Sequence, residues 1–282
     1  MSITRENRTA VAILIDCSGS MAEKVEFCGK SCTKAEAVAE VNNVILDELL
    51  ERARRHDGIR DYYDVAVVGY SGDGVESMLG DNNNPFISIQ ELAERTVSRV
   101  KFEEIVAKKG DTKGLFVHRE WVKPKATGQT PMHEALCYIH EYLNKWRQDP
   151  RHKDSFPPHL FHITDGEPTD CNDEDIIEVS RRIKSLTTTD GAFFLINVHI
   201  TTSANQRPLI FPTAEEMKEY SGSRYAQLLA ESASEMPEMF NESIREIKGV
   251  TSGSNFRGMS FNASIAGLIT ILNIGSISVK FG

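Results

Sequence analysis

Three oxygen-bearing side chains follow the first apolar run of the chain. The run is Val11–Ile15, and Asp16, Ser18 and Ser20 come directly after it. A carboxylate and two hydroxyls are hard ligands, which suit Mg²⁺ or Mn²⁺ better than a soft metal. A continuous Val/Ile/Leu run predicts a strand covered on both faces, so these side chains belong to the loop at its carboxyl end. Open α/β sheets bind ligands at that edge.

Two distant segments carry similar groups. Thr130 lies in Gly128–Met132, which opens a predicted helix, and Asp165 follows the apolar segment Phe161–Thr164. Proline is tolerated in the first turn of a helix, so Pro131 agrees with a helix start. Three loops therefore supply five oxygen side chains.

In this order, the segments D-x-S-G-S, G-x-T-P-M and I-T-D-G resemble the von Willebrand factor type A domain with its metal-ion-dependent adhesion site. The resemblance covers the three loops and the order of strands and helices, from about Thr9 to the last apolar helix. It says little about residues 71–125. It implies an octahedral Mg²⁺ or Mn²⁺, held directly by the hydroxyls and directly or through water by the carboxylates. The implied metal ligands are Asp16, Ser18, Ser20, Thr130 and Asp165.

The resemblance also implies a function. Neutral hydroxyls leave most of the dication's charge uncancelled, so an Asp or Glu of a partner protein can complete the metal shell. We therefore expect a non-catalytic, metal-dependent protein-interaction module, an adaptor of an intracellular bacterial type in a stress, defence or signalling complex. MoxR-type AAA+ ATPases and kinase/phosphatase pairs are the partners that such relatives imply. Met21, Gly166 and Glu167 flank the implied ligands and are candidate contacts.

The main enzymatic alternative is a Mg²⁺- or Mn²⁺-dependent phosphoesterase that uses the same loops. Such enzymes usually need a nucleophile or a second metal, and Ser18 stands where a second Asp would follow Asp16. A structural alternative is a solvated turn with a capping serine. Matches at three loops favour the metal site over a turn alone.

Two other catalytic motifs are incomplete. Gly69–Gly72 resembles the start of a nucleophile elbow, but Asp73 replaces the final glycine. Gly29–Ser31 resembles the end of a phosphate-binding loop, but Lys24 replaces the first glycine. Neither a serine hydrolase nor a nucleotide site is favoured.

Composition narrows the class of protein. The chain has 282 residues, 40% of them hydrophobic, and a net charge of −9, which argues against a nucleic-acid-binding surface. The polar start, Met1–Arg8, is unlike a secretory signal, and no apolar run approaches the roughly 20 residues that span a bilayer. We expect a cytoplasmic protein with no membrane contact.

Cysteine and histidine are assigned structural roles. An odd number of cysteines argues against a secreted disulfide framework, and we expect Cys28, Cys32 and Cys171 to be structural or incidental thiols. Cys17 should point into the core. His162 and His199 lie within predicted strands and are expected to be buried.

Strands and helices alternate, which predicts a doubly wound α/β fold: a mainly parallel sheet with helices on both faces. We expect one domain over residues 1–282, with a core of about 9–70 and 126–275 and an insertion of about 71–125 near the metal edge. Capping boxes at Thr33 and Thr213 predict helix starts. Within the insertion we expect a helix near Ile89–Val100 and strand-like segments at Phe116–His118 and Glu120–Val122. Asn262 is a candidate cap for the last helix.

Overall fold

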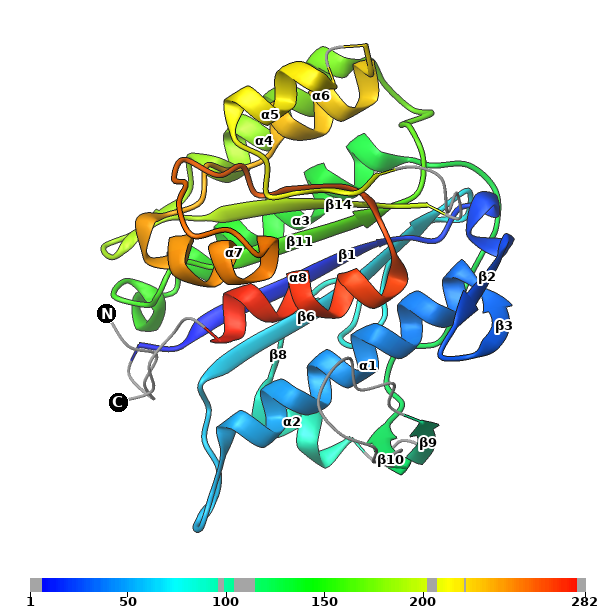
Figure 1. The fold of residues 1–282 in the computed structure, drawn as a ribbon. Coiled ribbons are helices and arrows are strands. Elements are labelled where there is room, and N and C mark those ends of the chain that lie inside the picture. Colours follow the sequence, from blue (N-terminus) through cyan, green and yellow to red (C-terminus); the bar gives the residue numbers. More distant parts are fainter. Residues whose placement is uncertain (1–6, 96–98, 104–114, 202–206, 221, 278–282) are drawn as a thin grey trace.

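The computed structural model describes residues 7–95, 99–103, 115–201, 207–220 and 222–277. Its centre is an eight-stranded sheet in the order β15-β16-β14-β11-β1-β6-β7, with β8 also paired to β6 (Figure 1). Five strands are mutually parallel: β1 (Thr9–Asp16), β6 (Tyr63–Ser71), β11 (His159–Thr164), β14 (Phe194–Ile200) and β16 (Met259–Ala263). Three short strands pair antiparallel: β7 (Gly74–Ser77), β8 (Ile87–Ser88) and β15 (Leu209–Ile210).

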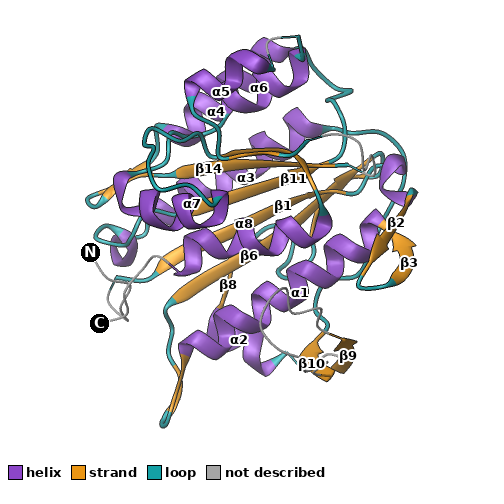
Figure 2. Cartoon of the chain, viewed as in Figure 1, coloured by secondary structure: helices purple, strands orange, loops and turns teal. Residues whose placement is uncertain are grey.

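Helices cover both faces of this sheet (Figure 2). One face carries α1 (Lys34–Ala53), α2 (Ile89–Glu94), α7 (Asn241–Lys248) and α8 (Ile265–Ile277). The other carries α3 (Met132–Gln148), α4 (Asp173–Lys184), α5 (Ala214–Glu219) and α6 (Arg224–Ser232). The prediction of a doubly wound, mainly parallel α/β fold is confirmed.

The central strand β1 explains why two layers of helices are needed. All eight of its residues are buried. Val11, Ile13 and Ile15 belong to the core beneath α1 and α8, whereas Ala12 and Leu14 belong to the core beneath α3 and α4. Successive side chains of a strand point to opposite faces, so a continuous apolar run requires cover on both.

Local sequence signals set the helix starts. Thr33 Oγ1 accepts a hydrogen bond from Glu36 N, and the carboxylate of Glu36 accepts one from Thr33 N, so the predicted capping box of α1 is present. Thr213 and Glu216 form the same box at α5. A third box, Asn172 with Asp175, starts α4.

Smaller elements connect these layers. They are the 3₁₀ turns η1 (Gly19–Ala22), η2 (Pro150–His152) and η3 (Glu238–Phe240), and the strand pairs β2 (Lys24–Phe27) with β3 (Lys30–Thr33), β4 (Arg54–Arg55) with β5 (Gly58–Ile59), β9 (Arg99–Glu103) with β10 (Leu115–Arg119), and β12 (Thr187–Thr188) with β13 (Gly191–Ala192).

Segment 71–125 divides into two parts. Its beginning extends the main sheet, because β7 and β8 pair with β6. Its later part packs beside α1, where Asn43 Oδ1 accepts hydrogen bonds from the backbone amides of Trp121 and Val122, both 2.8 Å long. Arg119 of β10 also pairs with Asp47 of α1, so this strand lies against α1, whereas the β6–β7 turn lies at the carboxyl edge of the sheet together with Lys125.

Several local expectations were wrong. The helix of segment 71–125 ends at Glu94, and Val100 lies in β9; residues 96–98 are outside the described part. Strand β10 includes Phe116–His118, but Glu120–Val122 is not a strand. Asn262 lies in β16 with a φ of 57°, and Ser264 Oγ instead accepts from Gly267 N at the start of α8.

Candidate metal centre

The two predicted carboxylates come from neighbouring strands. β1 and β11 are parallel and in register, with Ile15 opposite Ile163. Asp16 is the last residue of β1, and Asp165 directly follows β11. Both therefore lie at the carboxyl edge of the sheet, as the sequence predicts.

Four of the five predicted ligands form one connected cluster. They are Asp16, Ser18, Ser20 and Asp165. Ser18 Oγ lies 3.1 Å from Ser20 Oγ, and Ser20 Oγ donates to Asp165 Oδ1 at 2.7 Å. Ser18 N donates to Asp16 Oδ1 at 2.8 Å. Thr164 Oγ1 donates to the other oxygen of Asp16, Oδ2, at 3.0 Å. Asp16 is therefore held in one orientation from two sides.

The fifth predicted ligand, Thr130, is brought close by backbone contacts. Gly19 N donates to Gly128 O at 3.0 Å, and Thr127 N donates to Cys17 O at 2.8 Å. These bonds join the loop before α3 to the loop after β1. Thr130 itself is 7% exposed.

Two residues that the sequence analysis did not select fix the start of α3. Thr169 Oγ1 accepts from Thr130 N at 3.0 Å, and Thr169 N donates to Thr130 O at 3.1 Å. Asp170 accepts from the amides of His133 and Glu134. The N-cap residue, Pro131, makes no side-chain cap. Asp170 thus caps α3 from the loop after β11, a role that no local sequence pattern reveals.

A lysine completes the surroundings of Asp165. Lys34 Nζ lies 2.9 Å from Asp165 Oδ2 and 2.8 Å from Glu23 Oε2. The Asp165 side chain is fully covered, and that of Lys34 is 6% exposed. Burial opposes the charged ammonium, but the hydrogen bonds with Glu23 and Asp165 outweigh it and raise the pKa of Lys34.

Burial dominates the electrostatics of Asp16. It raises the pKa of Asp16 to about 6, against the opposing hydrogen bonds from Ser18 and Thr164. The nearby charge of Asp165 raises this pKa further. Two carboxylates that approach each other in a buried position favour a cation between or beside them.

The donor set fits a hard divalent cation. In an octahedral Mg²⁺ shell, bonds of about 2.1 Å place adjacent ligand atoms about 3.0 Å apart. The Ser18–Ser20 and Ser20–Asp165 oxygen separations of 3.1 and 2.7 Å are close to that spacing. Within the described residues, no three side chains of His, Cys, Asp or Glu form a metal-binding group. Any cation here would depend on hydroxyl oxygens as well as carboxylates.

The site opens to solvent on the side of η1. Gly19 and Ser20 are exposed, and a Cβ added to Gly166 would meet no atom within 4 Å. Met21, in contrast, is fully buried in the core, so of the flanking candidates it is the one that packs inside the fold and does not border the accessible side. Glu167 is exposed and lies 3.8 Å from Arg224. Ser20 and Gly166 therefore border the accessible side of the cluster.

A buried polar network begins at Tyr70, the neighbour of Asp16 in the sheet. Tyr70 OH lies 2.8 Å from His162 Nε2, and His162 Nδ1 lies 3.1 Å from Asn197 Oδ1. Asn197 Nδ2 donates to Leu229 O and Ser232 Oγ, so its oxygen accepts from His162 Nδ1. His162 is buried as predicted, and burial lowers its pKa to about 4.

The cysteines, Ser71 and His199, which the sequence also singled out, lie outside the cluster of predicted ligands. All five cysteines are free; Cys17 is 2% exposed in the core, and Cys28 and Cys32 belong to the β2–β3 hairpin. Burial raises the pKa of Cys17 to about 12.

Ser71 ends β6 at a turn into β7, not into a helix, so a nucleophile elbow is absent there. His199, only partly buried, accepts a hydrogen bond from Asn262 N.

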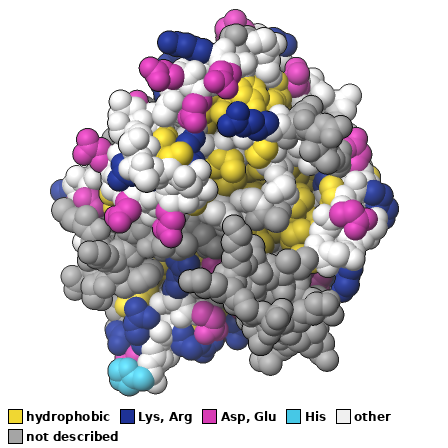
Figure 3. All heavy atoms as spheres, viewed as in Figure 1, with side chains coloured by type: hydrophobic (Ala, Val, Ile, Leu, Met, Phe, Trp, Pro, Cys, Tyr) yellow, Lys and Arg dark blue, Asp and Glu magenta, His cyan; other side chains and the backbone are white. Residues whose placement is uncertain are grey.

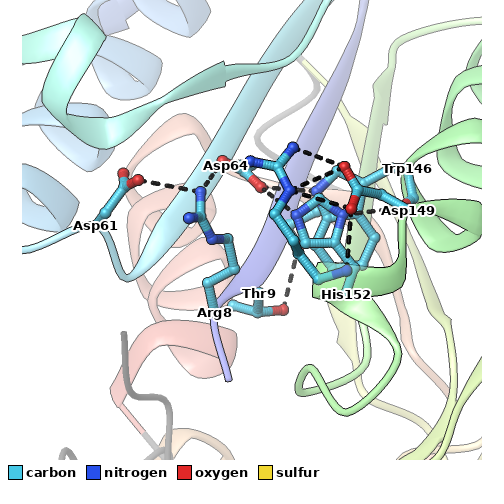
Figure 4. Close-up of polar contacts among 9 residues, drawn as sticks. Arg8, Thr9, Asp61, Asp64, Trp146, Asp149 and His152 are labelled. Atoms are coloured by element: carbon cyan, nitrogen blue, oxygen red, sulfur yellow. Dashed lines mark hydrogen bonds and ion pairs between the residues drawn. The ribbon is translucent and has the colours of Figure 1, made fainter. Parts of the chain in front are cut away.

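A second polar cluster lies at the opposite end of β1 (Figure 4). Asp64 accepts from Trp146 Nε1 at 2.7 Å and from Arg8 at 3.1 Å, and His152 Nε2 lies 3.4 Å from it. Thr9 Oγ1 donates to Pro157 O. These contacts tie the start of β1 to β6 and to the end of α3, roughly 23 Å from Asp16 at the usual rise of a strand.

On the face seen in Figure 3, acidic and basic side chains are interspersed over the residues that the structure describes. No helix formed by the described residues combines the length and apolar character needed to span a bilayer.

Known proteins resemble this chain in structure and not in overall sequence. The sequence matches no protein-family profile and no curated protein sequence. Among solved structures, it is similar to a von Willebrand factor type A protein from Catenulispora acidiphila, with 16% identity, a TM-score of 0.41 and coverage of 69% of this chain and 34% of that chain. It is also similar to proximal thread matrix protein 1 from the mussel byssus, whose MIDAS motif is occupied by zinc, with 13% identity, a TM-score of 0.46 and coverage of 95% and 47%.

A third similar structure is the vWF domain of the type V pili tip protein Mfa5 from Porphyromonas gingivalis, with 9% identity, a TM-score of 0.43 and coverage of 100% of this chain and 98% of that chain. The matches to the Catenulispora and mussel proteins span only 34% and 47% of their lengths. Independently of these values, the D-x-S-G-S, G-x-T-P-M and I-T-D-G loops meet at the carboxyl edge of a mainly parallel sheet with helices on both faces. The chain has a doubly wound, mainly parallel α/β fold, and its three loops resemble those of the von Willebrand factor type A domain.

Proposed function

We propose that the loops of Asp16, Thr130 and Asp165 bind one divalent cation, Mg²⁺ or Mn²⁺, and that this cation binds an Asp or Glu of a partner protein. The observation that carries the proposal is the contact series Ser18–Ser20–Asp165 beside the fixed carboxylate of Asp16. Two carboxylates balance the charge of a dication without exceeding it, and the neutral hydroxyls add no negative charge, so a coordination position left open can still accept a carboxylate of a partner.

The charges around the site support metal dependence. Exposed carboxylates near the loops include Glu23, Asp73, Glu167 and Asp170. Two of the nearby cations are already paired, Lys125 with Glu76 and Asp73, and Arg224 with Asp173 and Glu167. A carboxylate of a partner would be repelled by this rim unless a bound dication offset the negative charge of Asp16 and Asp165 and offered it a coordination position.

In this proposal the chain is an adaptor without catalysis of its own, working in the cytoplasm within a stress, defence or signalling complex. Binding suits the donor set better than hydrolysis, because the described residues near the site supply two carboxylates and hydroxyls but no third acidic or imidazole ligand. A MoxR-type AAA+ ATPase or a kinase/phosphatase pair is the class of partner proposed. The phosphoesterase alternative has no specific observation in its favour.

The first prediction concerns the metal. Isothermal titration of the metal-free protein should show one site for Mg²⁺ or Mn²⁺, and Asp16→Asn or Asp165→Asn should abolish it while the circular dichroism spectrum is retained. Asp57→Asn is the matched control, because Asp57 is exposed in the β4–β5 turn and pairs with Arg60. Zn²⁺ should be titrated in parallel, since it occupies the MIDAS motif of the mussel protein. Equal binding by all variants would refute the site.

A capture experiment tests the partner. Proteins bound from native lysate in Mg²⁺ should be released by EDTA and should be absent when Asp16→Asn is the bait. Partners retained through EDTA would contradict metal-bridged binding. Hydrolysis of para-nitrophenyl phosphate that disappears in Asp16→Asn would instead favour the phosphoesterase.

A further inference from the structure

Lys34 occupies an unusual position for a buried lysine. It is the first residue of α1, where the helix dipole disfavours a positive charge. It is also only 5% exposed. A cation that is both buried and at a helix N-terminus needs compensating negative charge, and its two ion-pair partners, Asp165 and Glu23, provide it.

The two partners differ in their surroundings. Asp165 has a fully covered side chain, whereas the side chain of Glu23 is 56% exposed. The β2–β3 hairpin connects Glu23 to Lys34: its first and last residues, Lys24 and Thr33, are paired, and Lys34 N donates to Glu23 O at 2.9 Å. Glu23 therefore stays within reach of Lys34 whatever happens at Asp165.

Both oxygens of Asp165 are already engaged. Oδ1 accepts from Ser20 Oγ, and Oδ2 accepts from Lys34 Nζ. A covered carboxylate without a cation would be costly, and Lys34 supplies that cation from within the chain. The ammonium thus neutralises the same group that a divalent metal would neutralise.

Building on the proposed metal site, we propose that Lys34 is a tethered competitor of the metal. In the metal-free protein its ammonium balances the charge of Asp165 and keeps the loops together. When a dication binds, repulsion moves the ammonium from Asp165 to Glu23. Lys34 is then a positioning and affinity-setting residue: it weakens metal binding and makes the metal-free loops stable enough to remain assembled.

The test is calorimetric titration of Mg²⁺ and Mn²⁺ into four single variants. Lys34→Met should bind metal about tenfold more tightly or better, the low end of what one unit charge a few ångström away contributes in a partly solvated site. Lys34→Arg keeps the charge and should stay near the original affinity. Glu23→Gln should bind more weakly, and Lys24→Met, an exposed lysine of the same hairpin, should not change.

Two further measurements separate competition from a merely structural role. In EDTA the melting temperature of Lys34→Met should fall below that of the original protein, and metal should raise it by more than it raises the original. The effect of Glu23→Gln on affinity should shrink in a Lys34→Met background, because the residue that moves to Glu23 is gone. Should Lys34→Met fail to fold, Glu23→Gln alone decides, and unchanged or tighter metal binding by it overturns the inference.

Metal binding by Lys34→Met that is equal to or weaker than that of the original protein also overturns the inference, while the proposed metal site stands. If neither the original protein nor any variant binds a divalent ion, the proposed function fails, and the role of Lys34 fails with it.

Discussion

At the scale of single residues, two glycines allow a close approach of two backbone segments near the site. A Cβ added to Gly128 would lie 2.6 Å from Gly72 Cα, and one added to Gly72 would lie 2.8 Å from Gly128 Cα. Gly128 also has a φ of 65°. The β6–β7 turn therefore presses against the loop that carries Thr130, and only residues without a side chain allow this contact.

Gly72→Ala and Gly128→Ala should each lower metal affinity by roughly tenfold or more, the usual effect of losing a support of a metal ligand. The reason is steric, since either Cβ must push the two loops apart. Titration calorimetry measures it. Gly249→Ala is the control: it ends α7, its φ is 67°, and a Cβ there meets nothing within 4 Å, so it carries backbone strain without a clash at the site. An equal loss of affinity in Gly249→Ala would contradict the steric explanation.

The five implied ligands could be chosen from the sequence because their spacing within each loop is local. Ser18 and Ser20 follow Asp16 on one turn, and the change from apolar to polar residues at Asp16 marks the end of the strand before them. Lys34, Thr169 and Asp170 could not be chosen in this way. Each acts on a residue far away in the sequence, and that approach exists only after β1, β11 and α3 have packed.

At the scale of elements, α3 depends on a cap from outside its own sequence. Its N-cap residue is Pro131, which offers no side-chain acceptor, and Asp170 accepts from two of its first amides. The negative charge of Asp170 also suits the helix dipole. The loop after β11 thereby stabilises the helix that follows Thr130.

Asp170→Ala should lower the free energy of unfolding by about 1 kcal/mol, the typical contribution of an N-cap, and should also weaken metal binding. Urea unfolding and calorimetry measure the two effects. Thr213→Ala is matched to it, because Thr213 caps α5 within its own capping box, away from the site. It should cost a similar free energy and leave metal affinity unchanged. Normal metal affinity in Asp170→Ala would show that the cap on α3 does not position Thr130 for metal binding.

Elements were predictable where their pattern is continuous and missed where it is short. Strands β1, β6 and β11 have long apolar runs, and α1 and α5 have capping boxes. Strand β16 was missed, because Met259–Ala263 includes Ser260 and Asn262 and gains its place by pairing with β14. The β2–β3 hairpin is polar and lacks the apolar alternation of a strand.

At the scale of the whole molecule, buried histidines make stability depend on pH. His159 is 1% exposed, its Nε2 has no hydrogen-bond partner among the residues that the structure describes, and it packs among Phe156, Phe194 and Phe240. Burial lowers its pKa to about 4. In the unfolded chain the ordinary pKa of histidine is about 6.5, so the unfolded state binds the proton first as the pH falls.

His159 thus contributes stability that is present above pH 6.5 and is lost as the pH falls toward 4. His159→Phe removes the imidazole that binds this proton in the unfolded state. The unfolding free energy of that variant should fall less steeply than that of the original protein, by about 1.4 kcal/mol per pH unit in this window. Urea unfolding at several pH values measures the difference, in which all other titrating groups cancel. Parallel curves for the two proteins would show that His159 does not titrate on unfolding.

The central strand has one more consequence. β1 is buried at every position and paired in register with β6 and β11. A slip of one residue would exchange its two sets of side chains between the faces of the sheet, which the packing forbids. The register of β1, and not the turn after it, therefore fixes the position of Asp16 at the edge of the sheet. Substitutions accumulating in the surrounding loops can alter what borders this carboxylate without displacing it.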